Sequence, residues 1–144
     1  MIDFLPGISS TAAALNAERQ RMDIISQNIA NANTTRGPDG LPYQRQQVVF
    51  ETVLQKQQAD SALGASPQMV HVAAVQKDNR PPQMVYNPGH PDADANGMVA
   101  MPNVNIHEEM ADLIVSSRSF EANLAVIKNA RFMAQQSLTI GKNL

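Results

Sequence analysis

The acidic turn at residues 92–97 is the segment whose residue types could most directly bind a ligand. Asp92, Asp94 and Asn96 have the D-x-D-x-N-G spacing that opens a calcium-binding loop. Such a loop needs a bidentate glutamate at its twelfth position, where this chain has Asn103. The surrounding prolines also exclude the helices that flank a calcium loop. The favoured interpretation is a turn whose short side chains cap their own backbone, with a calcium-binding module as the alternative.

A second segment, His107-Glu108-Glu109-Met110-Ala111, resembles the start of the zinc motif H-E-x-x-H. The second histidine of that motif is replaced here by alanine, and one imidazole cannot build a catalytic zinc site. The chain has no cysteine, no G-x-S-x-G motif and no glycine-rich phosphate loop. The sequence therefore predicts no catalytic residue, no metal and no cofactor, and an enzyme is the least favoured class.

Composition and charge exclude two classes of partner. The chain has 11 basic and 13 acidic residues, a net charge of -2, and no basic patch, so we expect no nucleic-acid binding. No apolar run approaches the length of a membrane span, so we expect no direct membrane insertion. A cleavable signal peptide is also not predicted, because polar residues interrupt the apolar run after Pro6.

The N-terminal part is predicted to form a helix over residues 8–33, with Ser9 or Ser10 as its cap. Its apolar side chains follow a spacing of three and four residues. Asn28, Asn31 and Asn33 weaken the end of this helix. They have two open interpretations: caps of the helix terminus, or a contact surface whose amides bind neighbouring backbone.

The C-terminal part gives the clearest pattern, a heptad repeat over residues 106–141. One row of this repeat is Ile106, Leu113, Phe120, Ile127, Ala134 and Gly141; the row four residues further on is Met110, Ser117, Leu124, Arg131 and Leu138. A helix of this length spans roughly 54 Å and needs a partner helix, for which residues 8–33 are the candidate. Because that partner is shorter, part of the repeat is left uncovered, which predicts self-association.

The middle of the chain has β and turn character. Strands are predicted over residues 43–53 and 69–75, with a loop over 55–68 between them. The five prolines within residues 77–105 predict an extended, turn-rich stretch that is poor in repetitive structure. The predicted fold is therefore mainly α: long terminal helices (residues 1–35 and 106–144) form a coiled coil, and a small β and loop insert (residues 36–105) lies between them. A free coiled-coil adaptor is an alternative function for such a fold.

Several blocks of the sequence resemble one family. Residues 26–34 (SQNIANANT) are similar to the N-terminal signature of flagellar rod, hook and hook-associated proteins. Residues 40–46 (GLPYQRQ) and 86–97 (YNPGHPDADANG) resemble the proximal rod subunits within that family. Residues 117–123 (SRSFEAN) and 138–141 resemble its C-terminal helix. Met98 and Phe120 stand where the family usually has tyrosine.

This resemblance implies a structural subunit that assembles helically into the proximal rod, the drive shaft that crosses the periplasm around the export channel. It implies four kinds of partner: other copies of the chain, other proximal and distal rod proteins, the basal-body ring or rod adaptor, and the flagellar type III export apparatus. The predicted coiled-coil and assembly interface comprises Ile8, Leu15, Met22, Ile25, Asn28, Ile29, Asn31, Asn33, Met110, Leu113, Phe120, Asn123, Leu124, Ile127 and Leu138.

Overall fold

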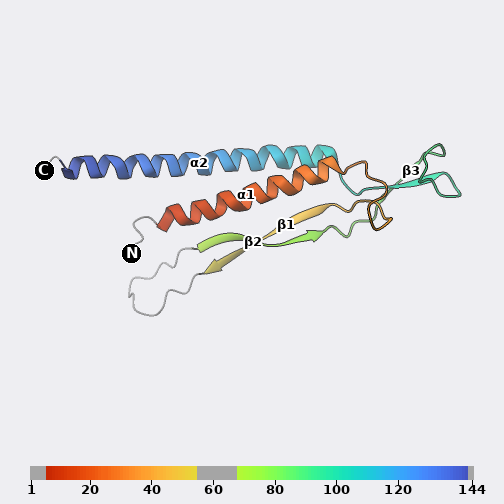
Figure 1. Cartoon of the computed structure of the whole chain (residues 1–144), viewed down its shortest axis with the longest axis horizontal. Helices are drawn as coiled ribbons and strands as arrows, with labels where there is room; N and C mark the ends of the chain where they lie inside the picture. The colour runs from red at the N-terminus through yellow and green to blue at the C-terminus, as the bar shows by residue number, and fades with distance from the viewer. Residues whose placement is uncertain (1–5, 55–67, 143–144) are drawn as a thin grey trace.

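The computed structural model describes residues 6–54 and 68–142 of the chain. Its elements are α1 (Pro6–Ala30), β1 (Gln46–Leu54), β2 (Gln68–Lys77), β3 (Gln83–Tyr86), β4 (Met98–Met101) and α2 (Ile106–Lys142). Figure 1 shows an elongated molecule in which α1 and α2 run antiparallel. α1 lies between α2 on one side and the β1–β2 ribbon on the other, and β3 and β4 lie at one end of the long axis. The predicted arrangement of two terminal helices around a small β insert is confirmed.

The first helix begins two residues earlier and ends three residues earlier than the helix predicted over residues 8–33. It begins at Pro6, since a proline in the first turn loses no intrahelical hydrogen bond. Ser10 therefore lies inside the helix, where its Oγ donates to Gly7 O at 3.2 Å instead of capping an amide. The helix ends at Ala30, and Asn31 closes the last turn by donating from its backbone nitrogen to Gln27 O at 3.0 Å.

The predicted strands pair with each other as the antiparallel ribbon β1–β2. The register pairs Gln46 with Lys77 and Val49 with Ala74, and it shifts by one residue before Phe50. This shift is a β-bulge, which increases the local twist of the ribbon where it passes along α1. The predicted loop at 55–68 lies, except for Gln68, outside the described residues.

The proline-rich stretch was predicted to be poor in repetitive structure, and after the end of β2 its repetitive structure is limited to the two short strands β3 and β4. β3 and β4 form an antiparallel hairpin whose register pairs Gln83 with Met101 and Tyr86 with Met98. The prolines flank these four-residue strands and do not interrupt them, so no ladder hydrogen bond is lost. Gly97 permits the turn before β4, because its φ of 74° is unfavourable for residues with a Cβ atom.

The helix pair is held together by a thin core. The buried apolar side chains among the described residues are Ala17, Ile25, Ala32, Val99, Pro102 and Val104, and the buried polar side chains are Asn28, Asn103, Glu109 and Ser116. Ala17 and Ser116 are small, so they allow the two helices to approach closely. Polar groups make up a large part of this interior, so their hydrogen bonds matter for the fold.

Candidate functional site

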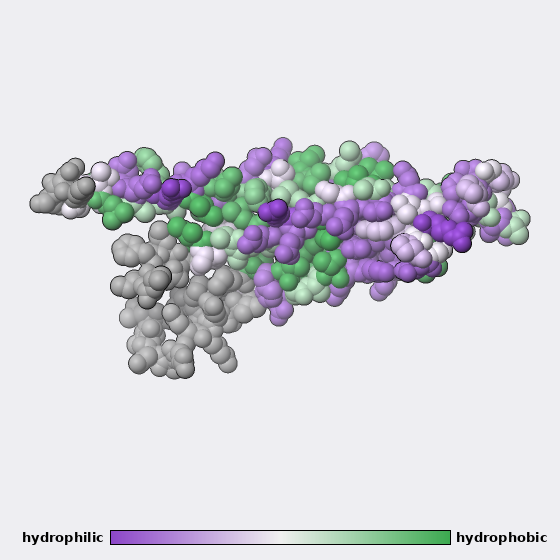
Figure 2. Space-filling view, viewed as in Figure 1, coloured by the Kyte–Doolittle hydropathy of each residue, from purple (hydrophilic) through white to green (hydrophobic). Residues whose placement is uncertain are grey.

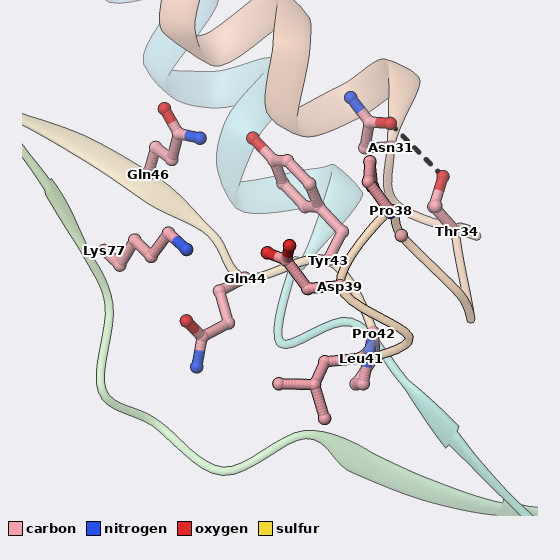
Figure 3. Close-up of a pocket in the computed structure, with 11 residues that line it drawn as sticks. Asn31, Thr34, Pro38, Asp39, Leu41, Pro42, Tyr43, Gln44, Gln46 and Lys77 are labelled. Carbon is pink, nitrogen blue, oxygen red and sulfur yellow. Dashed lines mark hydrogen bonds between the residues drawn. The ribbon is translucent and has the colours of Figure 1, made fainter.

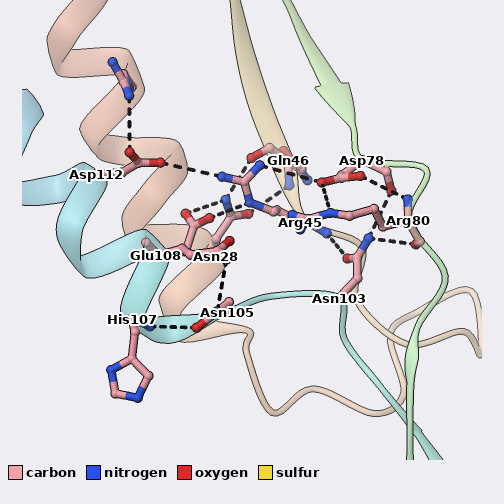
Figure 4. A network of polar contacts seen from close by, with 12 residues as sticks. Asn28, Arg45, Gln46, Asp78, Arg80, Asn103, Asn105, His107, Glu108 and Asp112 are labelled. Atoms are coloured by element: carbon pink, nitrogen blue, oxygen red, sulfur yellow. Dashed lines mark hydrogen bonds and ion pairs between the residues drawn. The ribbon is translucent and has the colours of Figure 1, made fainter.

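Glu109, in the first turn of α2, is the centre of a polar junction where both helices and the start of β1 meet (Figure 4). Its side chain is 0% exposed. Arg45, directly before β1, donates from Nε to Glu109 Oε1 at 2.5 Å, and Asn28 of α1 donates from Nδ2 to Oε2 at 2.9 Å. Both carboxylate oxygens thus have a partner, which offsets the cost of burying the charge. The polar junction is defined here as Asn28, Tyr43, Arg45, Asn103 and Glu109.

Asn28 connects α1 to β1 through an amide whose hydrogen-bonding capacity is fully used. Its Nδ2 also donates to Gln46 O at 2.8 Å, and its Oδ1 accepts from Gln46 N and from Tyr43 Oη, both at 2.9 Å. The amide therefore pairs with one residue of β1 as a neighbouring strand would. Burial, and then the negative charge of Glu109, raise the pKa of Tyr43 above its usual value, which favours the protonated hydroxyl that Asn28 accepts from.

Arg45 is surrounded by three carboxylates. Besides Glu109, Asp78 Oδ2 lies 3.7 Å from its Nη1 and Asp112 Oδ2 lies 3.7 Å from its Nη2. Burial alone would lower the pKa of Arg45, but the hydrogen bond to Glu109 and the charges of the three acids raise it overall. Asp112 also reaches Arg21 of α1, with its Oδ1 3.6 Å from Nη2, so the charge network connects α1, α2 and the β ribbon.

Asn103 fixes the segment before α2 to the end of the ribbon where β1 begins and β2 ends. Its Oδ1 accepts from the backbone nitrogen of Arg45 at 2.7 Å, and its Nδ2 donates to Asp78 O at 3.1 Å and to Arg80 O at 2.9 Å. Arg45 and Asp78 are also paired directly through their backbones, with Asp78 N 2.7 Å from Arg45 O. The polar junction therefore positions the β1–β2 ribbon and the entry to α2 relative to α1.

The sequence patterns did not predict that the residues of the polar junction bind one another. Asn28 was assigned to the assembly interface, yet it is 1% exposed and its amide partners lie within the chain. Of the other two asparagines of that motif, Asn31 is half-buried and donates from Nδ2 to Gln27 O at 2.9 Å, and Asn33 is exposed. Glu109 lies seven residues before Ser116 and so belongs to the same row of the heptad. Because Ser116 is buried, this row faces inward, and a charged side chain on it requires a partner.

The predicted apolar interface residues divide into two groups. Ile25 is buried, and Ile8, Leu15, Met22 and Ile29 of α1 are half-buried, as are Leu113, Phe120, Asn123, Leu124 and Ile127 of α2. Met110 and Leu138 are 51% and 76% exposed. The inward face of α2 therefore consists of two rows. One contains Leu113, Phe120 and Ile127, and the other lies four residues earlier and starts at Glu109. The row that starts at Met110 was predicted in its place.

Large apolar side chains remain exposed along much of α2. They are Ile106, Met110, Ile114, Val115, Val126, Phe132, Met133, Leu138 and Ile140. Figure 2 shows apolar patches on this helix, including its C-terminal part. Such a set of side chains exceeds the scattered exposure that is normal for a monomer, which marks the helix as a protein interaction surface.

The acidic turn caps its own backbone. Asp94 Oδ1 accepts from the backbone nitrogens of Asn96 and Met98, both at 2.8 Å. Asp92 Oδ2 accepts from Thr35 Oγ1 at 2.8 Å, and its Oδ1 lies 3.7 Å from Arg36 Nη1. The self-capped turn that the sequence favoured is thereby confirmed. Within residues 6–54 and 68–142, no group of three His, Cys, Asp or Glu side chains is placed to hold a metal ion.

A shallow hollow lies beside the turn between α1 and β1 (Figure 3). It is lined by Asn31, Thr34 and the Tyr43 side chain, together with Asp39 and Lys77. Thr34 Oγ1 donates to Asn31 Oδ1 at 3.2 Å, which is a structural bond within the turn. The lining contains no histidine, serine or cysteine. Neither helix of the described part of the chain is both long and apolar enough to cross a membrane.

Comparisons with known proteins give a consistent result. A family model described as "Flagella basal body rod protein" matches residues 9–38, and one described as "Flagellar basal body rod FlgEFG protein C-terminal" matches residues 95–140. The protein named Flagellar basal-body rod protein FlgC of Salmonella typhimurium is 42% identical over 130 residues, which cover 90% of this chain and 92% of that protein. Its namesake in Borreliella burgdorferi is 40% identical over 146 residues (92% of this chain, 94% of that protein), and the one in Bacillus subtilis is 37% identical over 146 residues (94% and 96%).

Proposed function

Because this chain belongs to the family of flagellar basal-body rod proteins and is a structural subunit of that rod, not an enzyme, we propose that many copies of it assemble helically into the proximal part of the rod. In this role the chain transmits torque across the periplasm and surrounds the export channel. Its partners in the assembly are further copies of itself, other proximal and distal rod proteins and the adaptor that joins rod and basal-body ring. It reaches the rod through the flagellar type III export apparatus, without a cleaved signal peptide.

The observation that carries this proposal is the exposure of apolar side chains on several sides of α2. Ile114 and Val115 are both 55% exposed although they are adjacent and therefore point about 100° apart on the helix. α1 covers only one side of α2, so the other sides have no partner within the described part of the chain. Burying a side chain of this size contributes roughly 1.5–3 kcal/mol, so a few such contacts per subunit can drive assembly.

The pairing of α1 with α2 is proposed to be a coiled coil. The inward side chains of α2 recur at seven-residue intervals, as Leu113, Phe120 and Ile127 do, which favours a supercoiled pair. Ile25, one of the interface residues predicted on α1, is buried, which supports this pairing. Met110 and Leu138 are the predicted interface residues that we assign to contacts with neighbouring subunits, because they are exposed in the single chain.

The polar junction supports the proposal that the subunit transmits force within the rod. Hydrogen bonds and ion pairs are directional, and those of Glu109, Arg45 and Asn28 fix the ribbon to the helix pair at a defined angle. A subunit in a rotating shaft must transmit force between its parts without changing their angle. The buried, fully bonded cluster is suited to that requirement.

The test places a charge on the exposed apolar side of α2. Val115→Asp and Val126→Asp change side chains that are 55% and 54% exposed, so the monomer should keep its fold while contacts between subunits are lost. Gln136→Asp, at an exposed polar position of the same helix, is the matched control. Each variant replaces the wild-type copy in the cells, and the readouts are motility and the amount of the chain in purified basal bodies.

We expect both valine variants to be absent from basal bodies and the glutamine variant to be present. Far-UV circular dichroism of the purified chains checks that all three retain the helices. If the two valine variants assembled and supported motility as the wild type does, the exposed side of α2 would not be an assembly surface.

A further inference from the structure

Two surfaces at opposite ends of the molecule have complementary character. α2 has 37 residues against 25 in α1, and its first turn lies beside the end of α1, so its last part extends beyond the start of α1 (Figure 1). We call residues 131–142 the projecting end of α2. At the opposite end of the long axis, a groove lies between the end of α1, the β3–β4 hairpin and the start of α2. We call it the distal groove; Asn33, Gln83, Val85, Val104, Ile106 and His107 contribute to its lining.

We propose that the projecting end of α2 of one copy docks into the distal groove of the next copy. This inference rests on the proposed function and specifies one of the contacts through which the subunits would assemble. The occupant of the groove is therefore a second copy of this chain.

The projecting end is apolar on more than one side. Phe132 and Met133 are 60% and 63% exposed, and Leu138 and Ile140 are 76% and 64% exposed. Met133 and Ile140 are seven residues apart and share one side of the helix, whereas Phe132 and Leu138 point in two other directions, so apolar side chains occupy three sides of the projecting end. A helix that protrudes alone with this composition is stable only when another surface covers it.

The distal groove is lined by both apolar and polar side chains, the mixture that protein interfaces usually have. Among its apolar side chains, Val104 is 7% exposed, and Val85 and Ile106 are 45% and 37% exposed. Asn33 and His107 contribute polar groups to its lining. Asn33 is part of the asparagine motif but not of the polar junction, so its amide is available to a helix in the groove.

Charge favours a second copy as the occupant. Residues 78–112, which include the hairpin and the start of α2, contain six acidic residues and one basic residue. Asp78, Asp92, Glu109 and Asp112 pair with arginines of the same chain, so Asp94 and Glu108 are the acids of this stretch that have no ion pair among the described residues. Residues 113–144 contain four basic residues and one acidic residue. Glu108, which binds Asn105 in the groove lining, is exposed, and so are Lys128 and Arg131 near the projecting end. The acidic end of one copy therefore attracts the basic end of another.

The two surfaces differ from each other and lie at opposite ends, so their contact is heterologous. Repeating a heterologous contact that does not close into a ring produces an open helical assembly, which is the form a rod requires. A contact between two projecting ends would instead pair two copies and stop.

Disulfide trapping tests the contact, because the natural sequence has no cysteine. Cells co-express Val85→Cys in one copy and Leu138→Cys in another, and their basal bodies are purified and oxidised. The control replaces Val85→Cys by Val75→Cys, which is 48% exposed on β2 and outside the distal groove. We expect at least ten times more disulfide-linked heterodimer from the Val85 pair than from the Val75 pair.

An equal yield from the two pairs, or a product made mainly of two Leu138→Cys chains, would overturn the proposed contact while the presence of both chains in basal bodies upheld the proposed function. Absence of the wild-type chain from basal bodies would overturn both.

A charge exchange provides a second test that does not depend on cysteine geometry. Glu108→Lys and Arg131→Glu should each lower incorporation into basal bodies several-fold, and the double variant should restore it, since the two charges are exchanged between docked ends. A double variant that incorporates as poorly as the worse single variant would contradict the pairing of these two ends.

Discussion

Glu109→Gln is the substitution that tests the polar junction most directly. In the wild type, Glu109 accepts one hydrogen bond on each oxygen, from Arg45 Nε and from Asn28 Nδ2. Glutamine offers one oxygen and one amino group, so in either orientation a donor faces a donor. The substitution also removes the nearest negative charge from Arg45 in a site that water does not reach.

The expected loss of unfolding free energy is about 3 kcal/mol. Removing one partner of a buried ion pair typically costs about 3–5 kcal/mol. The lower end applies here, because Asp78 and Asp112 remain 3.7 Å from the Arg45 guanidinium and still compensate its charge. Urea unfolding followed by the helical circular dichroism signal measures the difference.

The neighbouring residue provides the control. Glu108 carries the same side chain one position earlier in α2 but is exposed, and its Oε1 accepts only from Asn105 Nδ2 at 3.1 Å among the described residues. Glu108→Gln should therefore change the unfolding free energy by less than about 0.5 kcal/mol. A double-mutant cycle of Glu109→Gln with Arg45→Gln should give a coupling energy of about 1–3 kcal/mol. Equal effects of the two glutamine variants, or a coupling energy near zero, would refute the reasoning.

Three further predictions concern single positions. Asn28→Ala should cost about 3 kcal/mol of unfolding free energy, since it leaves several buried polar groups unpaired, whereas Asn33→Ala at an exposed site should cost less than about 0.5 kcal/mol; urea unfolding measures both. Gly97→Ala should destabilise the protein by about 1–2 kcal/mol because of its φ of 74°, whereas Gly141→Ala, in α2 with open space around it, should stabilise it by up to about 1 kcal/mol in the same assay. The pKa of Asp78 is lowered below 3.8, chiefly by a hydrogen bond from the backbone of Arg80. The stabilisation that Asp78 contributes is therefore complete above that pH and is lost as the pH falls through the lowered pKa. The difference in unfolding free energy between wild type and Asp78→Asn should be constant from neutral pH to about pH 5 and shrink below about pH 4.

The sequence predicted the helices and the first ribbon because both have a strong local pattern. The heptad of α2 and the β-branched runs of β1 and β2 each persist over many residues, so neighbouring positions support the same interpretation. The β3–β4 hairpin was not predicted, because its strands, such as Gln83–Tyr86, have four residues each and lie among prolines that indicate turns. Their pairing joins residues far apart in the chain, and a local pattern does not report that.

The inward face of α2 was only partly predictable for a different reason. Apolar residues occur on most sides of this helix, as Val115 and Leu113 show, so periodicity alone does not separate the face that meets α1 from the faces that meet other subunits. In the row that starts at Glu109, Asn123 was among the predicted interface residues, but Glu109 and Ser116 were overlooked because they are polar. Its burial depends on Arg45, a residue 64 positions away, and no rule of local spacing connects the two.

In the proposed assembly, polar and apolar contacts have different roles: apolar contacts join the subunit to its neighbours, and polar contacts hold its own parts together. Apolar contacts are non-directional, so the exposed side chains of α2 can meet neighbours at slightly different angles along a helical assembly. Hydrogen bonds depend strongly on angle, so the polar junction resists rotation of the ribbon about the helices. If Arg45→Met and Glu109→Leu replaced the buried ion pair by apolar side chains of similar size, the single chain should keep its stability. The same substitution should then lower the stiffness of the assembled rod without preventing its assembly, an outcome that bending measurements on purified rods can distinguish from simple destabilisation.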